Sequence, residues 1–204
     1  MRAPVKLFLA SSNPGKLNEY RVLANAPGTS FPVELELVPG FDTLPAFEEN
    51  APTFAENAAG KALHYSRFCD EYVFADDSGL AVPSLGGAPG VHSARYAGIN
   101  ATNAERIEKL LREMRAKKNS DRAAHFVCAI ALARKGHAVC VITERVNGEI
   151  LESPCGSGGF GYDPVFYFPP LKRTFAELTT EEKNRYSHRG KAFGKLLVAV
   201  STML

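Results

Sequence analysis

Two adjacent carboxylates, Asp76 and Asp77, are the side chains of this sequence best suited to chemistry. They follow the apolar run 72–75, which predicts a buried strand that ends at the acids, and they precede a Ser78-Gly79 pair that predicts a turn. Carboxylates are costly to bury unless a cation or protons share their charge. Since open α/β sheets bind ligands beyond the carboxyl ends of their strands, this position indicates a site that takes a cation.

A second candidate segment is the polar loop 11–16, Ser-Ser-Asn-Pro-Gly-Lys. An apolar run precedes it, and apolar residues at three-residue spacing follow from Leu17, so the pattern predicts strand, tight loop and helix. Such a loop directs backbone N–H groups and a helix N-terminus at one point, which suits a phosphate, and Lys16 adds a positive charge. An ordinary turn between a strand and a helix uses the same residue types, and the Gly-x4-Gly-Lys spacing of a P-loop is absent.

Lys61 has an unusual place in the next predicted helix. Thr53 and Glu56 have the spacing of a capping box, which predicts a helix from there to about Phe68. At about 100° per residue, Lys61 falls in the middle of the apolar stripe of this helix, on the same side as Asn57. A lysine there either extends along the apolar surface to solvent or meets an anion beneath the helix.

The glycine-rich segment 156–164 is a third candidate. Glycines beside aromatic residues allow the backbone to approach a flat ligand, Phe160 can stack on a base, and Asp163 can accept hydrogen bonds from a ring or a sugar. A glycine-rich turn whose aromatic side chains pack into the core would show the same residue types.

The last predicted helix begins at a further group of polar residues. Ser187 is a good N-cap for a helix whose apolar face includes Phe193 and Leu196. His188 and Arg189 then project from the N-terminus of this helix.

The remaining segments predict the elements that position these residues. Segments 33–38, 126–133 and 138–143 predict strands, and a capping box at Thr102 predicts an amphipathic helix. Asn147-Gly148 predicts a type I′ hairpin. Because antiparallel pairs then lie in the middle of the sheet, we expect an α/β fold with a mixed central sheet flanked by helices.

Composition restricts the class of protein. The chain has 204 residues, of which 45% are hydrophobic and 23% charged, as expected for one globular domain spanning 1–204. The formal net charge of +2 gives no electrostatic reason to expect nucleic acid or a membrane as partner. The four cysteines form no CxxC pair, and neither a signal peptide nor a membrane span is evident. We therefore expect a cytoplasmic protein without disulfides or a zinc site.

Six segments occur here in the order typical of one family. They are residues 11–16, 53–58, 75–80, 90–96, 159–164 and 187–189. With all six in register over nearly the whole chain, the sequence resembles the inosine/xanthosine triphosphate pyrophosphatases, which remove deaminated purine nucleotides.

This resemblance implies an activity and a set of ligands. Members hydrolyse ITP, dITP and XTP to the nucleoside monophosphate and pyrophosphate, use Mg²⁺, are usually homodimeric, and have an elongated α/β fold with two lobes around a substrate cleft. Matched by position, Asp77 would be the catalytic proton acceptor and, with Glu48, a ligand of Mg²⁺. The residues expected to bind substrate are Ser11, Ser12, Asn13, Pro14, Gly15 and Lys16 at the triphosphate, Lys61 at a phosphate, Ser78 beside Asp77, and Phe160, Gly161, Tyr162, Asp163, Lys183, His188 and Arg189 at the base.

The sequence also departs from the family pattern. Ser11-Ser12 stands where Thr-Gly is usual, and His92 replaces the usual tyrosine. The segment 50–52 follows Glu49 where Thr-Gly is commoner, so Glu48 and Glu49 both remain candidates for the metal ligand.

Two other functions are compatible with these motifs. One is a purine nucleotide-binding sensor that does not hydrolyse its ligand, and the other is a related pyrophosphatase acting on modified pyrimidine nucleotides. The adjacent acids Asp76 and Asp77 favour hydrolysis, because a sensor has no need of them beside a triphosphate. A pyrimidine-specific relative would differ only in the base pocket.

Overall fold

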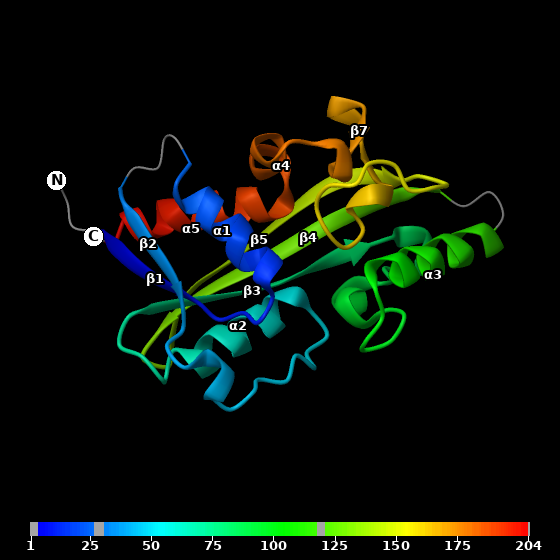
Figure 1. Ribbon diagram of the computed structural model, residues 1–204. Coiled ribbons are helices and arrows are strands. Elements are labelled where there is room, and N and C mark those ends of the chain that lie inside the picture. The colour runs from blue at the N-terminus through cyan, green and yellow to red at the C-terminus, as the bar shows by residue number, and fades with distance from the viewer. Residues whose placement is uncertain (1–3, 27–30, 118–120, 204) are drawn as a thin grey trace. The chain divides into compact units, whose positions relative to one another are not determined.

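Figure 1 shows the computed structural model, which describes residues 4–26, 31–117 and 121–203. The strands are β1 (Val5–Leu9), β2 (Val33–Leu37), β3 (Tyr72–Ala81), β4 (Ala123–Arg134), β5 (His137–Ile150), β6 (Phe166–Phe168) and β7 (Arg173–Thr174). The α-helices are α1 (Pro14–Ala24), α2 (Phe54–Tyr65), α3 (Asn103–Ala116), α4 (Thr180–Tyr186) and α5 (His188–Ser201). Short 3-10 turns occur at Phe41–Thr43, Pro83–Leu85, Gly90–Arg95, Asp163–Val165, Pro169–Leu171 and Phe175–Glu177.

The described strands form one seven-stranded sheet in the order β2-β1-β3-β4-β5-β6-β7. β1 is parallel to both of its neighbours, and its Leu7 lies opposite Leu35 of β2 and Tyr72 of β3. β6 is antiparallel to both β5 and β7. Parallel pairing on one side of the sheet and antiparallel pairing on the other confirm the predicted mixed sheet.

The chain divides into two compact units, which are described separately. Unit 1 comprises the described residues within 1–77, 128–144 and 189–204, and unit 2 those within 78–127 and 145–188. β3, β4 and β5 each contribute residues to both units.

Helices cover both faces of the sheet in unit 1. Figure 1 shows α1 and α5 on one side of β1 and β3, and α2 on the other. Side chains alternate along a strand, so Leu7 and Leu9 point into one core and Phe8 into the other. The first core includes Leu7, Leu9, Tyr20, Phe74, Ile130, Phe193 and Leu196, and the second includes Phe8, Ala58, Ala62, Tyr65, Val73 and Ala131. Strands buried on both faces explain the nearly continuous apolar runs of the sequence.

In unit 2, α3 packs its apolar face on the sheet. Ile107, Leu110 and Leu111 share a buried cluster with Leu80 of β3 and Phe126 of β4. The capping box predicted at the start of this helix is confirmed: the Oγ1 atom of the N-cap accepts from the N3 backbone N–H, and the N3 glutamate accepts from the N-cap N–H.

β3 is longer than the sequence suggests, and the prediction that the strand ends at Asp76 and turns at Ser78-Gly79 is wrong. The strand runs over Tyr72–Ala81, so both acids lie inside it. Its pairing with β1 extends only to Phe74, which places the acids beyond the carboxyl end of β1. Gly79 permits a close approach instead of a turn, because a Cβ atom there would lie 2.3 Å from Oγ of Ser93.

The type I′ hairpin predicted at Asn147-Gly148 is also wrong. β5 runs without interruption over His137–Ile150. A Cβ atom on Gly148 would lie 2.5 Å from the carbonyl oxygen of Tyr167, so this glycine allows β6 to approach β5. The two-residue turn lies at Lys135-Gly136, where φ is +50° and +77°, as a type I′ turn requires.

Within the described residues, no helix has both the length and the apolar character that a bilayer-spanning segment requires. The four cysteines are free thiols.

Candidate functional site

The residues predicted to bind and transform a ligand fall into two groups, one in each unit. The group in unit 1 is Ser11, Ser12, Asn13, Pro14, Gly15, Lys16, Glu48, Lys61, Asp77 and Arg189. The group in unit 2 is Ser78, Phe160, Gly161, Tyr162, Asp163, Lys183 and His188.

In unit 1, Asp76 is fully buried and is held by cations. Nζ of Lys16 lies 3.0 Å from its Oδ2 atom, and Nε of Arg189 lies 3.7 Å from the same oxygen. Burial alone would raise the pKa of Asp76, but attraction to Lys16 and Arg189 outweighs burial and holds this pKa below its ordinary value. Asp76 is therefore ionised at neutral pH and fixes Lys16 beside it.

Arg189, in the first turn of α5, is 3% exposed. Its guanidinium group forms an ion pair with Glu19 of α1 and lies over the ring of Tyr20. Burial lowers the pKa of Arg189, but Glu19 and Asp76 raise it by more, so the group stays charged. The sequence predicts a base-pocket role for Arg189, whereas its side chain is held by acids of unit 1.

Asp77 differs from Asp76 because its partner is a neutral amide. Nδ2 of Asn57 donates a hydrogen bond of 2.9 Å to its Oδ2 atom, and no described residue forms an ion pair with it. Burial raises the pKa of Asp77 to about 6; the charge of Glu49 adds to this effect, and the hydrogen bond from Asn57 opposes it. A carboxyl group with this pKa is suited to accept a proton near neutral pH.

Glu48 and Glu49, which lie in the segment that leads into α2, have different partners. Glu49 forms an ion pair with Nζ of Lys61, so this lysine meets an anion beneath its helix. Glu48 is exposed, and its Oε2 atom accepts a hydrogen bond of 2.8 Å from Nδ2 of Asn50. Of these two acids, Glu49 is the one whose charge raises the pKa of Asp77.

These partners decide which acids can take an added cation. Asp77 and Glu48 have neutral amide partners, whereas Asp76, Glu49 and Glu19 are paired with lysine or arginine. One or two carboxylates, waters and phosphate oxygens are the usual ligands of Mg²⁺ in enzymes, so these two acids fit the ion. In the described part of the chain, no three His, Cys, Asp or Glu side chains are grouped to hold a metal. Waters and phosphate oxygens would supply the remaining ligands of such an ion.

The loop between β1 and α1 folds around Asn13. Its Oδ1 atom accepts hydrogen bonds from N of Gly15 at 2.9 Å and from N of Lys16 at 3.3 Å, which caps the helix that begins at Pro14. The predicted order of strand, loop and helix is confirmed. The amides expected to face a phosphate are bonded to Asn13 in this structure.

Three serines were also predicted to contact the ligand. Ser11 is buried, and its Oγ atom accepts a hydrogen bond of 3.2 Å from N of Asn13. Ser12 is exposed, and Ser78 is half-buried. Of the three, the exposed side chain of Ser12 is the most accessible to a ligand.

In unit 2, Asp163 organises the glycine-rich loop. Its Oδ2 atom accepts a hydrogen bond of 2.8 Å from N of Phe160 and lies 2.7 Å from Nζ of Lys183. The same Nζ atom lies 4.7 Å from the centroid of the Phe160 ring. Gly159 has φ of +70°, and a Cβ atom there would lie 2.0 Å from Oδ2 of Asp163. This loop therefore requires glycine at position 159.

Phe160 and Gly161 line a cavity of about 540 Å³ in unit 2. Ile107 and Leu111 of α3 form part of its apolar lining, and Arg115 contributes a charge. Small-molecule sites occupy roughly 300–1,000 Å³, so the cavity is large enough for a flat heterocycle.

The other predicted base-pocket residues of unit 2 are packed. Tyr162 is 4% exposed, and its hydroxyl donates a hydrogen bond of 3.0 Å to the carbonyl oxygen of Ser93. His188 is 4% exposed, and its ring stacks on Phe126 with centroids 4.7 Å apart and an interplanar angle of 9°. This stacking covers one face of the imidazole ring.

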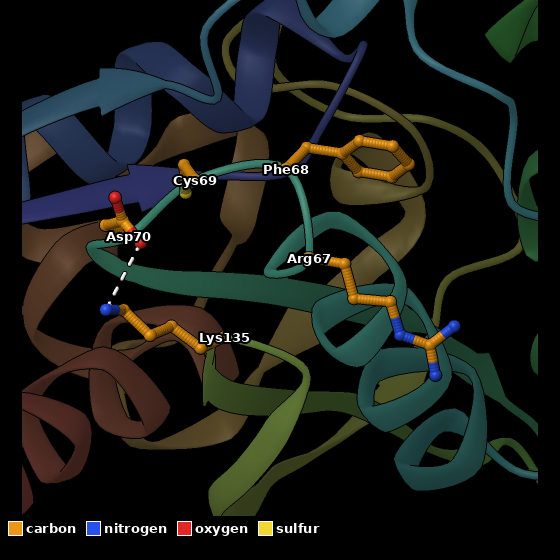
Figure 2. Close-up of a pocket in the computed structure, with 5 residues that line it drawn as sticks. All are labelled: Arg67, Phe68, Cys69, Asp70 and Lys135. Carbon is orange, nitrogen blue, oxygen red and sulfur yellow. Dashed lines mark ion pairs between the residues drawn. The ribbon is translucent and has the colours of Figure 1, made fainter.

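Another hollow, of about 460 Å³, lies in unit 1, and its lining residues are drawn in Figure 2. Its lining residues are Arg67, Phe68, Cys69, Asp70 and Lys135. Nζ of Lys135 lies 3.2 Å from Oδ1 of Asp70, with side chains 60% and 87% exposed, while Arg67 and Phe68 point away from this pair. Exposed ion pairs contribute little to stability. Since none of the candidate site residues predicted from the sequence lines this hollow, we assign it no function.

Sequence reasoning missed three side chains that hold the predicted residues. Glu19 pairs with Arg189, Asn57 bonds Asp77, and Phe126 stacks on His188. Only Asn57 carried a signal, because it lies on the same side of its helix as Lys61.

The arrangement defines an α/β protein with a buried acidic group just beyond the carboxyl end of the parallel strand β1. The model of the Ham1 family matches residues 7–199. A dITP/XTP pyrophosphatase from Geobacillus kaustophilus is 47% identical over 191 residues, which cover 94% of this chain and 92% of the relative. Another, from Thermosynechococcus vestitus, is 50% identical over 192 residues, which cover 92% of this chain and 91% of the relative.

The solved structures agree with this match. A HAM1 protein from Coxiella burnetii has a TM-score of 0.86 at 41% identity and covers 97% of this chain and 99% of its own. The Ham1 protein of Staphylococcus aureus has a TM-score of 0.84 at 37% identity, and the match covers 98% of this chain and 100% of that protein. The chain belongs to the Ham1 family.

Proposed function

We propose that this protein is a Mg²⁺-dependent pyrophosphatase that hydrolyses the non-standard purine nucleotides ITP, dITP and XTP to the nucleoside monophosphate and pyrophosphate. Relatives named dITP/XTP pyrophosphatase, 47% and 50% identical over more than nine-tenths of both chains, support the activity. The observation that carries the proposal is the pairing of Asp77. This buried acid has a neutral amide as its partner, whereas Asp76 and Glu49 form ion pairs with lysines.

The residues of unit 1 fit the requirements of the reaction. Attack of water on the α-phosphorus needs positioning, neutralisation of charge and a proton acceptor. Asp77 takes the proton of the attacking water, since it is ionised above a pKa of about 6. Asp77 and Glu48 would hold Mg²⁺, which when bound supplies positive charge that neutralises the phosphates. Lys16 and Lys61 exchange their carboxylate partners for phosphate oxygens.

The residues of unit 2 fit recognition of a purine. Phe160 presents a ring for stacking, and Asp163 with Lys183 fixes the orientation of that ring. Hypoxanthine and xanthine carry an oxygen at C6, where adenine carries an amino group. Donors of segment 187–188, which lies in unit 2, would pair with that oxygen and stay unpaired against adenine, and such sites discriminate by roughly 10⁴-fold.

A panel of nucleoside triphosphates with product identification tests the proposal. We expect ITP, dITP and XTP to yield the monophosphate and pyrophosphate with Mg²⁺, and ATP to react slowly. Release of a diphosphate and phosphate would contradict the proposed bond cleavage. Binding of ITP without any product would indicate a sensor, and preference for a modified pyrimidine nucleotide would indicate the related pyrophosphatase.

Asp77→Asn tests the role of the proton acceptor within the same panel. The substitution conserves shape and the acceptor for Asn57, and we expect turnover to fall by about 10³-fold or more while the fold is retained. Turnover near that of the unaltered protein would remove Asp77 from this role.

For assembly we propose a homodimer, on the strength of the family resemblance alone. Light scattering at several protein concentrations tests it. A mass of 22.1 kDa at every concentration would contradict it.

A further inference from the structure

Asn57 connects two parts of the acidic group in unit 1. It lies in the first turn of α2 and is 1% exposed. Its Oδ1 atom accepts a hydrogen bond of 2.9 Å from N of Ala51, and its Nδ2 atom donates one of 2.9 Å to Oδ2 of Asp77. One amide group therefore joins the connection that carries Glu48 and Glu49 to the strand that carries Asp77.

The orientation of this amide is determined by its partners. The backbone N–H of Ala51 can only donate and the carboxylate of Asp77 can only accept, so the amide oxygen faces the first and the amide nitrogen the second. Nδ2 also lies 3.4 Å from the carbonyl oxygen of Ala51. The backbone of Asn57 is fixed by the helix cap, in which Oγ1 of Thr53 accepts from N of Glu56 at 3.2 Å.

Asn57 also determines which oxygen of Asp77 is available. In the described part of the chain, Asn57 donates the one hydrogen bond to this carboxylate, and it uses Oδ2. The bond holds the carboxylate plane and leaves Oδ1 for another ligand. A neutral donor does this without cancelling the negative charge, whereas Lys16 cancels that of Asp76.

We propose that Asn57 is a positioning residue for the reaction: its bond to Oδ2 orients Asp77 and leaves Oδ1 for the water and the ion that Asp77 would serve, and its bond to N of Ala51 anchors the segment that carries Glu48. The inference rests on the proposed function, because it assumes that these two acids serve one ion and one water. Partners that orient metal ligands typically change activity or metal affinity 10–100-fold when they are removed.

Two substitutions of Asn57 separate its two contacts. Asn57→Leu keeps the number and branching of the side-chain heavy atoms and removes both hydrogen bonds. Asn57→Asp keeps an acceptor for N of Ala51 but replaces the donor to Asp77 by a like charge. Tyr65→Phe is the matched control, because the Tyr65 hydroxyl accepts from N of Phe47 at 3.4 Å and thus joins the same connection to α2 without touching Asp77.

We expect kcat for dITP to fall about 10–100-fold in both Asn57 variants, with KM within about threefold of the unaltered protein. Binding of Mn²⁺ without nucleotide, measured by electron paramagnetic resonance, should weaken about tenfold or more in Asn57→Leu. Tyr65→Phe should stay within about twofold in all three quantities, since it leaves the acids in place. Circular dichroism and thermal melting establish that each variant is folded.

Two outcomes would overturn the inference. One is a folded Asn57→Leu that keeps both kcat and Mn²⁺ affinity. The other is an Asn57→Asp that keeps kcat while Asn57→Leu loses it, because the bond to Ala51 alone would then matter. If Asn57→Leu does not fold, Asn57→Ala replaces it in both measurements. Failure of the proposed function is seen separately, as an unaltered protein that releases no pyrophosphate from dITP.

Discussion

Lys16 and Asp76 form a buried ion pair that joins the start of α1 to the middle of β3, with Nζ 3.0 Å from Oδ2. The side chain of Asp76 is completely buried and that of Lys16 is 13% exposed, so water screens the pair very little. Removal of one partner of such a pair leaves the other charge uncompensated, which costs more than the loss of a surface pair.

We therefore expect Lys16→Met to lower the free energy of unfolding by about 3 kcal/mol at pH 8. Without Lys16 the pKa of Asp76 rises, so the cost should be smaller at pH 5, where protonation removes part of the buried charge. Urea unfolding at both pH values measures the two losses. Lys6→Met is the control, since Lys6 pairs with Glu36 at 3.3 Å on the surface and should cost less than about 1 kcal/mol. Equal losses for the two variants would contradict the importance of burial.

The raised pKa of Asp77 predicts a gain of stability when its charge is removed. The pKa of Asp77 is about 6 in the folded protein and about 4 in the unfolded chain, so between these values the folded protein binds more protons. Stability therefore falls as the pH rises from about 4 to about 6. Each pH unit between the two pKa values corresponds to roughly 1.4 kcal/mol. In EDTA at pH 8, we expect Asp77→Asn to be more stable than the unaltered protein by about 1–3 kcal/mol, and equally stable near pH 4.

Thermal and urea unfolding in EDTA measure this difference. If Asp77→Asn is less stable than the unaltered protein at pH 8, then the charge of Asp77 does not destabilise the metal-free folded protein.

Glu48 and Glu49 can be separated by their dependence on Mg²⁺. Glu48→Gln removes an acid with a neutral partner, so we expect the Mg²⁺ concentration for half-maximal activity to rise about tenfold or more. Glu49→Gln leaves Glu48 and Asp77 in place, so this concentration should change by less than about threefold, while KM for dITP changes because Lys61 loses its ion pair. Titration of activity with Mg²⁺ measures both, and the reverse order would assign the metal to Glu49.

Gly159→Ala should disturb the loop that holds Phe160. At φ of +70° any added Cβ is strained, and here it would meet Oδ2 of Asp163 at 2.0 Å. Gly161→Ala is the matched control for stability, because Gly161 has φ of +66° and no atom within 4 Å of the added Cβ. We expect Gly161→Ala to cost about 1–2 kcal/mol from backbone strain alone and Gly159→Ala to cost clearly more. Urea unfolding of the two variants decides this, and equal losses would mean that Asp163 moves freely.

Much of the fold could be predicted from local patterns. The apolar runs located β1, β2 and β4, and the Thr-x-x-Glu spacing located the start of α2 and of α3. The same spacing at Thr179 and Glu182 begins α4, so that helix was also readable although it was not predicted. These signals are reliable because each depends on residues within one helical turn.

The failures came where a distant residue decided the outcome. Gly148 looked like a turn glycine, but its missing side chain makes room for Tyr167, nineteen positions further on. Asp76 and Asp77 looked like the end of a strand, but β3 continues through them. Likewise, the sequence motifs indicated that three cations belong to the site, but no spacing predicted their acidic partners. These pairs are Lys16 with Asp76, Lys61 with Glu49, and Arg189 with Glu19.

The segmented build of unit 1 has a consequence for its biosynthesis. The last of its three segments begins at Arg189, after every residue of unit 2. Phe193 and Leu196 of that segment close the core around Tyr20 and Phe74. On the ribosome, all of unit 2 therefore emerges while these two aromatic side chains still lack their cover. Unit 1 is therefore the part of the nascent chain that exposes apolar core surface for longest, and such surface is what makes partly folded chains aggregate.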